Sequence, residues 1–327
     1  MPLPQLARYA DTVRYDAERG LALALDWRAY PAETALMAYS DVEAIVHAID
    51  LGAVRHAAVA YLAGYGLALA AREWAARPSD ARRGALIQAG EWLRRAAPDD
   101  PRMRRLLDQA LALADSATLA GEDAEAALLR LVQGELSRAD RVAERCGRIA
   151  AGLLDEGDRV LTHGFAGSAL IWMLHVALAE QAKPITLTVL APPTPDDDMR
   201  LCADLARAIG LPVALLDVPA TERAFEPVAS TVFVAGAERI ALDGGAAGAP
   251  GAARYAELAR QHGLPCYVLG GDGPDPALDR LMAASDVMRP ELISAIITSR
   301  GIYRPEMIAR YLGDGDAPLD VIPLSLS

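Results

Sequence analysis

From about residue 158 onward, short runs of β-branched and apolar residues alternate with longer segments of helical periodicity, and this alternation most limits the possible folds. The runs cover residues 160–163, 185–190, 213–217, 231–235 and 266–269, and the helical segments cover residues 168–180, 198–209 and 252–261. Strands and helices that alternate at this spacing favour right-handed crossovers and a parallel sheet covered on both faces. The sequence therefore predicts an α/β fold in which ligands bind at the carboxyl ends of the strands.

The preceding part of the chain has a different pattern. Two short extended runs cover residues 12–15 and 21–25, and apolar residues at helical spacing then predict helices over residues 42–49, 53–74, 85–96 and 103–114. Ser40, followed by Glu43, is typical of a capping box at the start of the first of these helices. A sustained apolar stripe over residues 122–154 predicts one long amphipathic helix. We therefore expect a mainly helical domain at residues 1–121, a connecting helix at 122–154 and a parallel-sheet domain at 155–327.

Composition narrows the classes of partner. The chain has 327 residues, a net charge of −12 and a pI near 4.9, which disfavours long-range attraction to nucleic acid. No apolar run reaches the roughly 18 to 20 residues that a bilayer span needs, and the N-terminus does not resemble a signal peptide. Cysteines at positions 146, 202 and 266 fit neither a disulfide framework nor a metal site. We expect a reduced cytoplasmic protein that has no membrane or nucleic-acid partner and needs no metal or cofactor.

The stretch from residue 158 to residue 175 combines a strand pattern, a turn with two glycines and the start of a helix. Gly164 and Gly167 permit a sharp reversal that brings the backbone close to a ligand, and Ser168 is a candidate helix cap. Unpaired N–H groups at such a helix start bind anions. An ordinary turn between a strand and a helix explains the same residues, so the turn alone leaves both interpretations open.

Four segments together are more specific than this turn. Residues 161–168, 234–245, 255–268 and 289–302 occur in the order seen in one family. The chain resembles the regulatory subunits of eukaryotic translation initiation factor 2B and the related sugar-1-phosphate isomerases. Its N-terminal half is most similar to methylthioribose-1-phosphate isomerase, both over residues 50–66 and at Arg77-Pro78-Ser79, and the resemblance extends from about residue 20 to residue 310.

This resemblance implies a mostly helical N-terminal domain, a Rossmann-like C-terminal domain, a homodimer and a pocket between the domains for a phosphorylated sugar. Enzymes of the family convert a ring-closed aldose 1-phosphate to a ketose without a metal. One group protonates the ring oxygen and hydrogen moves from C2 to C1. The family assigns these roles to a cysteine and an aspartate in an apolar pocket.

The sequence departs from the family pattern at functional positions. Gly164 replaces the cysteine of Thr-His-Cys-Asn-Ala-Gly, and Glu238 replaces the aspartate before Arg239. The usual Asn-Lys pair falls at about Gly248-Ala249, and His56 replaces the glycine after an arginine. In the loop after the second strand, the family's Arg-Pro and Gln-Gly fall near residues 193–194 and 197–198, which would place negative charge where phosphate contacts are expected.

Ten residues are candidates for the site. Glu238 is either a general acid or half of an ion pair with Arg239, and His163 is either a base or a structural residue bonded to backbone. Arg55 and Arg77 either hold a phosphate or form salt bridges between the domains. His56 is either a ligand contact or a plug that fills the phosphate site. The predicted catalytic residues are Glu238 and His163, and the predicted substrate-binding residues are Arg55, His56, Arg77, Gly164, Phe165, Ala166, Gly167 and Arg239.

Two functions remain open at this level. One is a divergent aldose–ketose isomerase that acts on a sugar 1-phosphate without the usual cysteine. The other is a catalytically inactive ligand-binding or scaffold protein related to the initiation factor subunits.

The Gly270-Gly271-Asp272-Gly273 segment is a weak candidate for an anion cradle, because it lacks a lysine and the spacing of a phosphate-binding loop.

Overall fold

The computed structural model describes residues 3–98, 100–120, 123–191, 198–217, 222–226, 230–281 and 286–310. The chain divides into two compact units, one of residues 8–140 and one of residues 1–7 with 141–327. Helix α6 (Ala124–Ala151) supplies residues to both units, so the division falls inside the helix predicted over residues 122–154.

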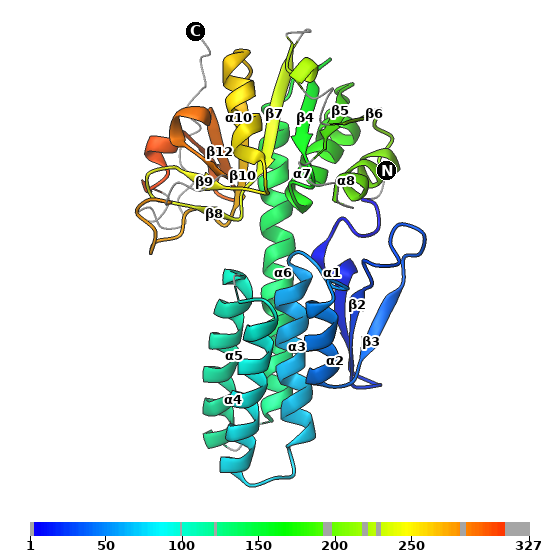
Figure 1. Ribbon diagram of the computed structural model, residues 1–327, viewed down its shortest axis with the longest axis vertical. Helices are drawn as coiled ribbons and strands as arrows, with labels where there is room; N and C mark the ends of the chain where they lie inside the picture. The colour runs from blue at the N-terminus through cyan, green and yellow to red at the C-terminus, as the bar shows by residue number, and fades with distance from the viewer. Residues whose placement is uncertain are drawn as a thin grey trace. The chain divides into compact units, whose positions relative to one another are not determined.

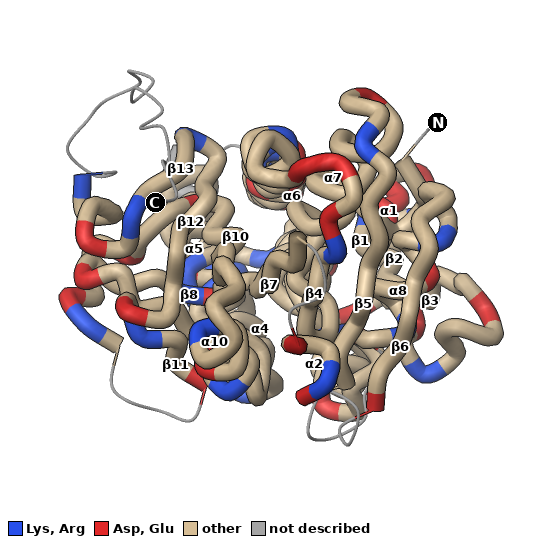
Figure 2. Tube along the Cα trace, turned by 90° about the horizontal axis from the view of Figure 1, so that it is seen from above, with Lys and Arg blue, Asp and Glu red and all other residues tan. Residues whose placement is uncertain are grey.

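The C-terminal unit is built on a seven-stranded sheet, which confirms the predicted α/β fold. In spatial order the strands are β13 (Gly301–Tyr303), β12 (Ala295–Thr298), β10 (Cys266–Gly271), β7 (Thr231–Gly236), β4 (Arg159–His163), β5 (Thr186–Leu190) and β6 (Val213–Leu216). Figure 2 shows them in this order. All neighbours are parallel except β12 and β13.

The order of the strands reverses between β4 and β7. From β4 the chain builds outward through β5 and β6, then returns to place β7 on the other side of β4 and continues through β10 to β12. In open α/β sheets, such a switch point opens a crevice at the carboxyl ends of the two strands, and ligands bind there. This topology therefore marks the ends of β4 and β7 as the place to look for a site.

Helices cover both faces of this sheet. They are α7 (Ser168–His175), which continues as a π-helix over Val176–Glu180, α8 (Asp198–Ala208) and α10 (Ala252–Gln261). Figure 2 shows α6 and α7 on one face and α10 on the other. Because side chains alternate along a strand, Leu161 and His163 point toward α10, and Thr162 points to the opposite face. Two 3₁₀ turns, Pro290–Leu292 and Pro305–Met307, flank the last strands.

A small antiparallel sheet follows β7. Its strands are β8 (Arg239–Ile240), β9 (Ala246–Ala247) and β11 (Val287–Met288), with β9 in the middle. The β8–β9 hairpin therefore grows directly out of the carboxyl end of β7.

The N-terminal unit packs a short antiparallel sheet against helices. The sheet consists of β1 (Val13–Asp16), β2 (Leu21–Leu25) and β3 (Leu36–Tyr39), preceded by α1 (Tyr9–Thr12). The helices are α2 (Val42–Asp50), α3 (Ala58–Glu73), α4 (Ser79–Ala96) and α5 (Pro101–Ala120). Figure 1 shows α3, α4, α5 and the start of α6 side by side. Every residue of α3 from Leu62 to Ala71 is buried, because its alanines and glycines let neighbouring helices approach on all sides.

Two predicted helix caps are wrong. Helix α2 is capped by Asp41, whose Oδ1 accepts a hydrogen bond from the Ala44 N–H at 2.8 Å, and the Ser40 hydroxyl donates to Asp41 instead. Helix α7 is preceded by Gly167 without a side-chain cap, and Ser168 is its first residue.

No helix in the described part of the chain is both long and apolar enough to cross a bilayer.

Candidate functional site

The loops that leave β4 and β7 touch each other at the switch point. A Cβ atom on Gly236 at the end of β7 would lie 2.8 Å from the Ala166 carbonyl oxygen and 2.9 Å from its Cα. Only glycine therefore allows the two loops to come this close. The topology and this contact together bring the predicted segments 163–167 and 236–239 to one edge of the sheet, called the carboxyl edge below.

Gly164 is a buried residue at this edge, and the space where a side chain would project from it is open. Its φ of +56° lies in the left-handed region, and a Cβ atom there would meet no atom within 4 Å. Gly167 has a φ of +86° and directly precedes the first turn of α7, where the Leu170 N–H donates to the Gly167 carbonyl oxygen at 3.1 Å. Phe165 and Ala166, between the two glycines, are half-buried.

No cysteine of the chain replaces the missing thiol. Cys146, Cys202 and Cys266 are all buried, and burial raises the pKa of each thiol to about 12. The Cys146 sulfur donates to the Ile297 carbonyl oxygen at 3.3 Å and faces the N–H groups of Gly270 and Gly271. The glycine-rich segment that was a weak candidate for an anion cradle is therefore turned toward a buried thiol of α6.

Glu238 and Arg239 lie side by side on the chain where β7 passes into β8, and both side chains are exposed. The Glu238 N–H donates to the Ala247 carbonyl oxygen at 2.8 Å, which anchors its backbone in the β8–β9 hairpin. Among the described residues no ion pair joins the Glu238 carboxylate to the Arg239 guanidinium. The carboxylate thus lies at the carboxyl edge in contact with solvent and not in an internal ion pair.

His163 is not exposed to a ligand. It is 4% exposed, its Nε2 lies 2.6 Å from the Pro250 carbonyl oxygen, and its ring meets the Tyr255 ring edge-on at 4.8 Å. Because a carbonyl oxygen can only accept, Nε2 carries the hydrogen of this bond; within the described residues Nδ1 has no partner. These contacts match the structural role and not the predicted catalytic one.

The segment from Gly248 to Gly251, called the return loop below, connects β9 to α10. A Cβ atom on Gly248 would lie 2.9 Å from the Ala252 Cβ and 3.0 Å from the Gly236 carbonyl oxygen. The Asp286 carboxylate accepts the Gly251 N–H at 2.7 Å. Gly248 thus leaves no room for the asparagine that the family pattern has at about this position. Nor does the chain supply a lysine there, since its only lysine, Lys183, donates to the Ala151 and Leu154 carbonyls at the end of α6.

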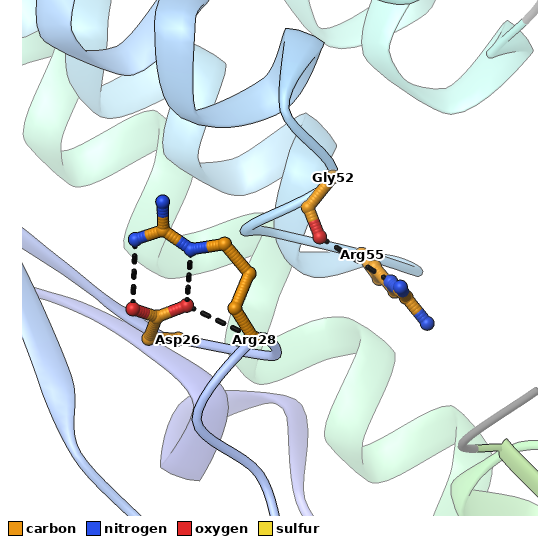
Figure 3. Close-up of polar contacts among 4 residues, drawn as sticks. All are labelled: Asp26, Arg28, Gly52 and Arg55. Carbon is orange, nitrogen blue, oxygen red and sulfur yellow. Dashed lines mark hydrogen bonds and ion pairs between the residues drawn. The ribbon is translucent and has the colours of Figure 1, made fainter.

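In the N-terminal unit, Arg55 and His56 immediately precede α3. The Arg55 Nε donates to the Gly52 carbonyl oxygen at 3.3 Å (Figure 3). His56 is exposed, has a φ of +57°, and sets its ring edge-on to the buried Trp27 ring at 5.1 Å. Its backbone thus has a left-handed conformation at a position where the family pattern has glycine, and a residue with a Cβ adopts this conformation only with strain.

Figure 3 also shows a second arginine of this unit whose charge is already compensated. Arg28 Nη2 lies 2.8 Å from Asp26 Oδ2, and its Nε donates to Oδ1 at 2.9 Å. The Arg28 side-chain hydrogen bonds lower the pKa of the Asp26 carboxyl. Sequence reasoning missed this pair, because the positions Asp26 and Arg28 carry no motif.

Arg77 lies at the other end of α3. It follows the last turn, with its guanidinium over the Trp74 ring at 5.9 Å from the centroid. A 16-residue helix is about 24 Å long, which exceeds the reach of two arginine side chains around one phosphate. Within one chain, Arg55 and Arg77 therefore cannot hold the same phosphate, and that interpretation is wrong.

Two further expectations concern the loop after β5 and metals. Residues 192–197 of that loop lie outside the described residues, so the predicted changes at 193–194 and 197 have no structural counterpart here. Within the described ranges, no three His, Cys, Asp or Glu side chains gather in a way that could hold a metal ion.

With this geometry in place, comparison with known proteins gives a consistent result. The sequence model of the Initiation factor 2 subunit family matches residues 54–271. The chain belongs to this family. Methylthioribose-1-phosphate isomerase of Anaeromyxobacter sp. (strain Fw109-5) is 30% identical, covering 89% of this chain and 94% of that protein. The isomerase of the same name from Syntrophotalea carbinolica is 29% identical over 88% of this chain and 95% of that protein.

Solved structures of the family have the same fold. The 5-methylthioribose 1-phosphate isomerase from Pyrococcus horikoshii OT3 aligns with a TM-score of 0.75 at 22% identity, covering 95% of this chain and 96% of that one. The delta subunit of translation initiation factor eIF-2B from A. fulgidus aligns with a TM-score of 0.65 at 22% identity, covering 90% and 96%. At these identities the structural likeness establishes the fold alone.

Proposed function

We propose that the carboxyl edge binds a phosphorylated sugar and that the protein acts as an aldose–ketose isomerase on a sugar 1-phosphate. The observation that carries this proposal is the Glu238 carboxylate, which is exposed at the switch point two residues after the contact between Gly236 and Ala166. The relatives named methylthioribose-1-phosphate isomerases support the substrate class.

The chemistry can proceed without a thiol at position 164. Ring opening of a furanose 1-phosphate needs a proton on the ring oxygen as its bond to C1 breaks. Hydrogen then moves with its electron pair from C2 to C1, and the C2 hydroxyl releases its proton to become the ketone. We assign both proton transfers to Glu238, which gives its proton to the ring oxygen and regains one from the C2 hydroxyl. The carboxyl group thus ends the cycle in its starting state.

Binding would use the groups that surround this carboxylate. The N–H groups at the start of α7, reached through the loop of Gly164, Phe165, Ala166 and Gly167, suit phosphate oxygens. The Arg239 guanidinium supplies a positive charge next to Glu238. In the other unit, Arg55 and His56 at the start of α3 stay predicted substrate-binding residues, and Arg77 is no longer proposed as a partner of Arg55.

The test is to incubate the purified protein with ribose 1-phosphate and 5-methylthioribose 1-phosphate and to follow ketose signals by NMR. We expect turnover in the wild-type protein, loss of at least about 100-fold in Glu238→Gln, and wild-type turnover in Glu257→Gln, an exposed glutamate on α10. Absence of turnover on both sugars, or full turnover by Glu238→Gln, would contradict the isomerase proposal.

A second candidate is a binding protein without catalysis. It is favoured by Gly164, which carries no thiol, and by Gly248, which leaves no room for a larger side chain. Calorimetry with the same two sugars separates the candidates, because binding without ketose formation supports the second. The homodimer, the cytoplasmic location and the absence of a nucleic-acid partner stay predictions. Mass measurement in solution by light scattering tests the first of these.

A further inference from the structure

We propose that His163 is a positioning residue: its imidazole holds the return loop and, through it, the β8–β9 hairpin that carries Glu238. This inference rests on the proposed function, in which Glu238 exchanges protons with the sugar. It assigns His163 a role through another residue, in place of direct contact with the substrate.

The first step is the contact between β4 and the return loop. The His163 Nε2–H donates to the Pro250 carbonyl oxygen at 2.6 Å, and the ring also packs edge-on against Tyr255, one turn into α10. Tyr255 is itself fixed, because its hydroxyl donates to the Ala191 carbonyl oxygen at 2.7 Å, just past the end of β5. His163 therefore joins the ends of two neighbouring strands to the loop and to the start of α10.

The second step leads from Pro250 to Glu238. Three residues before Pro250, the Ala247 carbonyl oxygen accepts the Glu238 N–H at 2.8 Å. The return loop begins at Gly248 and ends at Gly251, and glycines restrict the backbone little. External contacts must therefore fix its path, and two residues, His163 and Asp286, provide such contacts.

Asp286 makes two further hydrogen bonds with the return loop. Its carboxylate accepts the Gly251 N–H at 2.7 Å, and its backbone carbonyl accepts the Gly248 N–H at 3.2 Å. Pro250 has no N–H of its own, so its carbonyl oxygen is the group through which its own backbone can be held. Loss of the His163 bond should therefore loosen the loop without unfolding the sheet beneath it.

The test compares His163→Leu, which removes the donor, with His163→Gln, which retains one. Thr162→Val is the control, since it alters the neighbouring buried residue that points to the other face of the sheet. Amide hydrogen exchange is measured by NMR at Glu238, Gly248 and Gly251, with Val268 and Ile296 in β10 and β12 as references. We expect exchange about tenfold faster at the first three amides in His163→Leu, near wild-type rates in His163→Gln, and unchanged rates at the references.

Two results would overturn the inference. One is unchanged exchange at Glu238 in His163→Leu, and the other is acceleration as large at Val268 and Ile296 as at Glu238, which indicates general destabilisation. If His163→Leu does not fold, the ¹⁵N spectrum of the wild-type imidazole decides, because hydrogen on Nδ1 and not on Nε2 excludes the bond to Pro250.

Ribose 1-phosphate turnover gives the functional readout. We expect His163→Leu to lower kcat by about tenfold or more, with His163→Gln restoring it, and equal kcat in both variants and the wild type would contradict the role. If the wild-type protein neither binds nor converts the sugar, the proposed function fails, while the exchange experiment still decides whether His163 positions the loop.

Discussion

At the scale of single residues, the backbone at position 164 and the packing around the cysteines define which nucleophiles the carboxyl edge can offer. Gly164 has a left-handed φ and open space where a side chain would project. The native thiols are buried, with pKa values raised to about 12. Because the thiolate is the reactive form, we expect no native cysteine to react in the folded protein at neutral pH.

This leads to a prediction for Gly164→Cys. The new side chain fits sterically, but the left-handed backbone should lower the free energy of unfolding by about 1 kcal/mol. Titration with a thiol reagent at pH 8 should label one thiol in this variant and none in the folded wild-type protein, and three in the unfolded wild-type chain. Labelling of a native cysteine without unfolding would show that the buried environment is not maintained in solution.

Asp26 and Arg28 allow a prediction about pH. Hydrogen bonds from Arg28 lower the pKa of the Asp26 carboxyl below its ordinary value of 3.8, so the folded state binds this proton less tightly than the unfolded state. The pair therefore contributes stability above pH 3.8, and that contribution is lost as the pH falls through the lower folded value. Asp26→Asn should destabilise the protein in urea at pH 7, and this cost should be smaller at the lowest pH at which the protein stays folded. An equal cost at both pH values would contradict the pairing.

At the same scale, the sequence predicted the chemistry of residues better than their orientation. It placed Gly164, Glu238 and Arg239 at strand ends, because strand limits follow from local patterns of apolar residues. It could not show that His163 points into the α10 face, or that Gly248 is packed against Gly236, since both facts depend on contacts between segments far apart in the chain. Asp286, which completes this arrangement, lies in a segment without a local signal, and the predicted helix that contains Tyr255 does not by itself reveal the contact with His163.

At the scale of elements, α6 shows how closely two helices approach within the C-terminal unit. A Cβ atom on Gly147 would lie 2.4 Å from the Trp172 Cβ and 2.5 Å from the Ala169 carbonyl oxygen of α7. On the same helix, Gly134 is exposed, and a Cβ atom there would meet nothing within 4 Å. One helix thus contains a glycine packed against its neighbour and a glycine with open space around it, so the two can be compared directly.

We predict opposite effects of alanine at these two positions. Gly147→Ala should lower the free energy of unfolding by about 3 kcal/mol, because backbone atoms of α7 must move. Gly134→Ala should raise it by up to about 1 kcal/mol through helix propensity. Chemical denaturation monitored by circular dichroism measures both. A stabilising Gly147→Ala would mean that α6 and α7 do not pack at this distance.

The elements also show the limits of pattern reading. The five strands predicted from residue 158 onward and the three helices between them are confirmed. Each strand is apolar, and all but the largely exposed edge strand β6 are mostly buried. The strands β8, β9, β11 and β13 were missed, since two or three residues are too few to show a period. The four-residue strands β3 and β12 were missed as well. Helix α4 begins at Ser79 and not at residue 85, because its first turns are exposed and polar.

At the scale of the whole molecule, the division into two compact units gives a way to locate ligand binding. The four tryptophans are divided unequally, with Trp27, Trp74 and Trp92 in the unit of residues 8–140 and Trp172 in the other. Trp172 is buried on α7, the helix whose first turn borders the carboxyl edge. Its fluorescence therefore reports on unfolding of the unit that contains Glu238.

We predict that ribose 1-phosphate stabilises the unit containing Trp172. A ligand at about 100 times its Kd adds about 2.7 kcal/mol to the stability of the state that binds it, which for a unit of this size is a rise of several degrees in Tm. The difference between the melting curves of the wild-type protein and Trp172→Phe isolates the signal of this unit. The sugar should shift that difference curve upward, and it should do so equally in Glu257→Gln, which alters an exposed side chain on α10. If the sugar leaves the Trp172 signal unmoved while it stabilises the tryptophans of the other unit, the ligand is held at the start of α3 and not at the ends of β4 and β7.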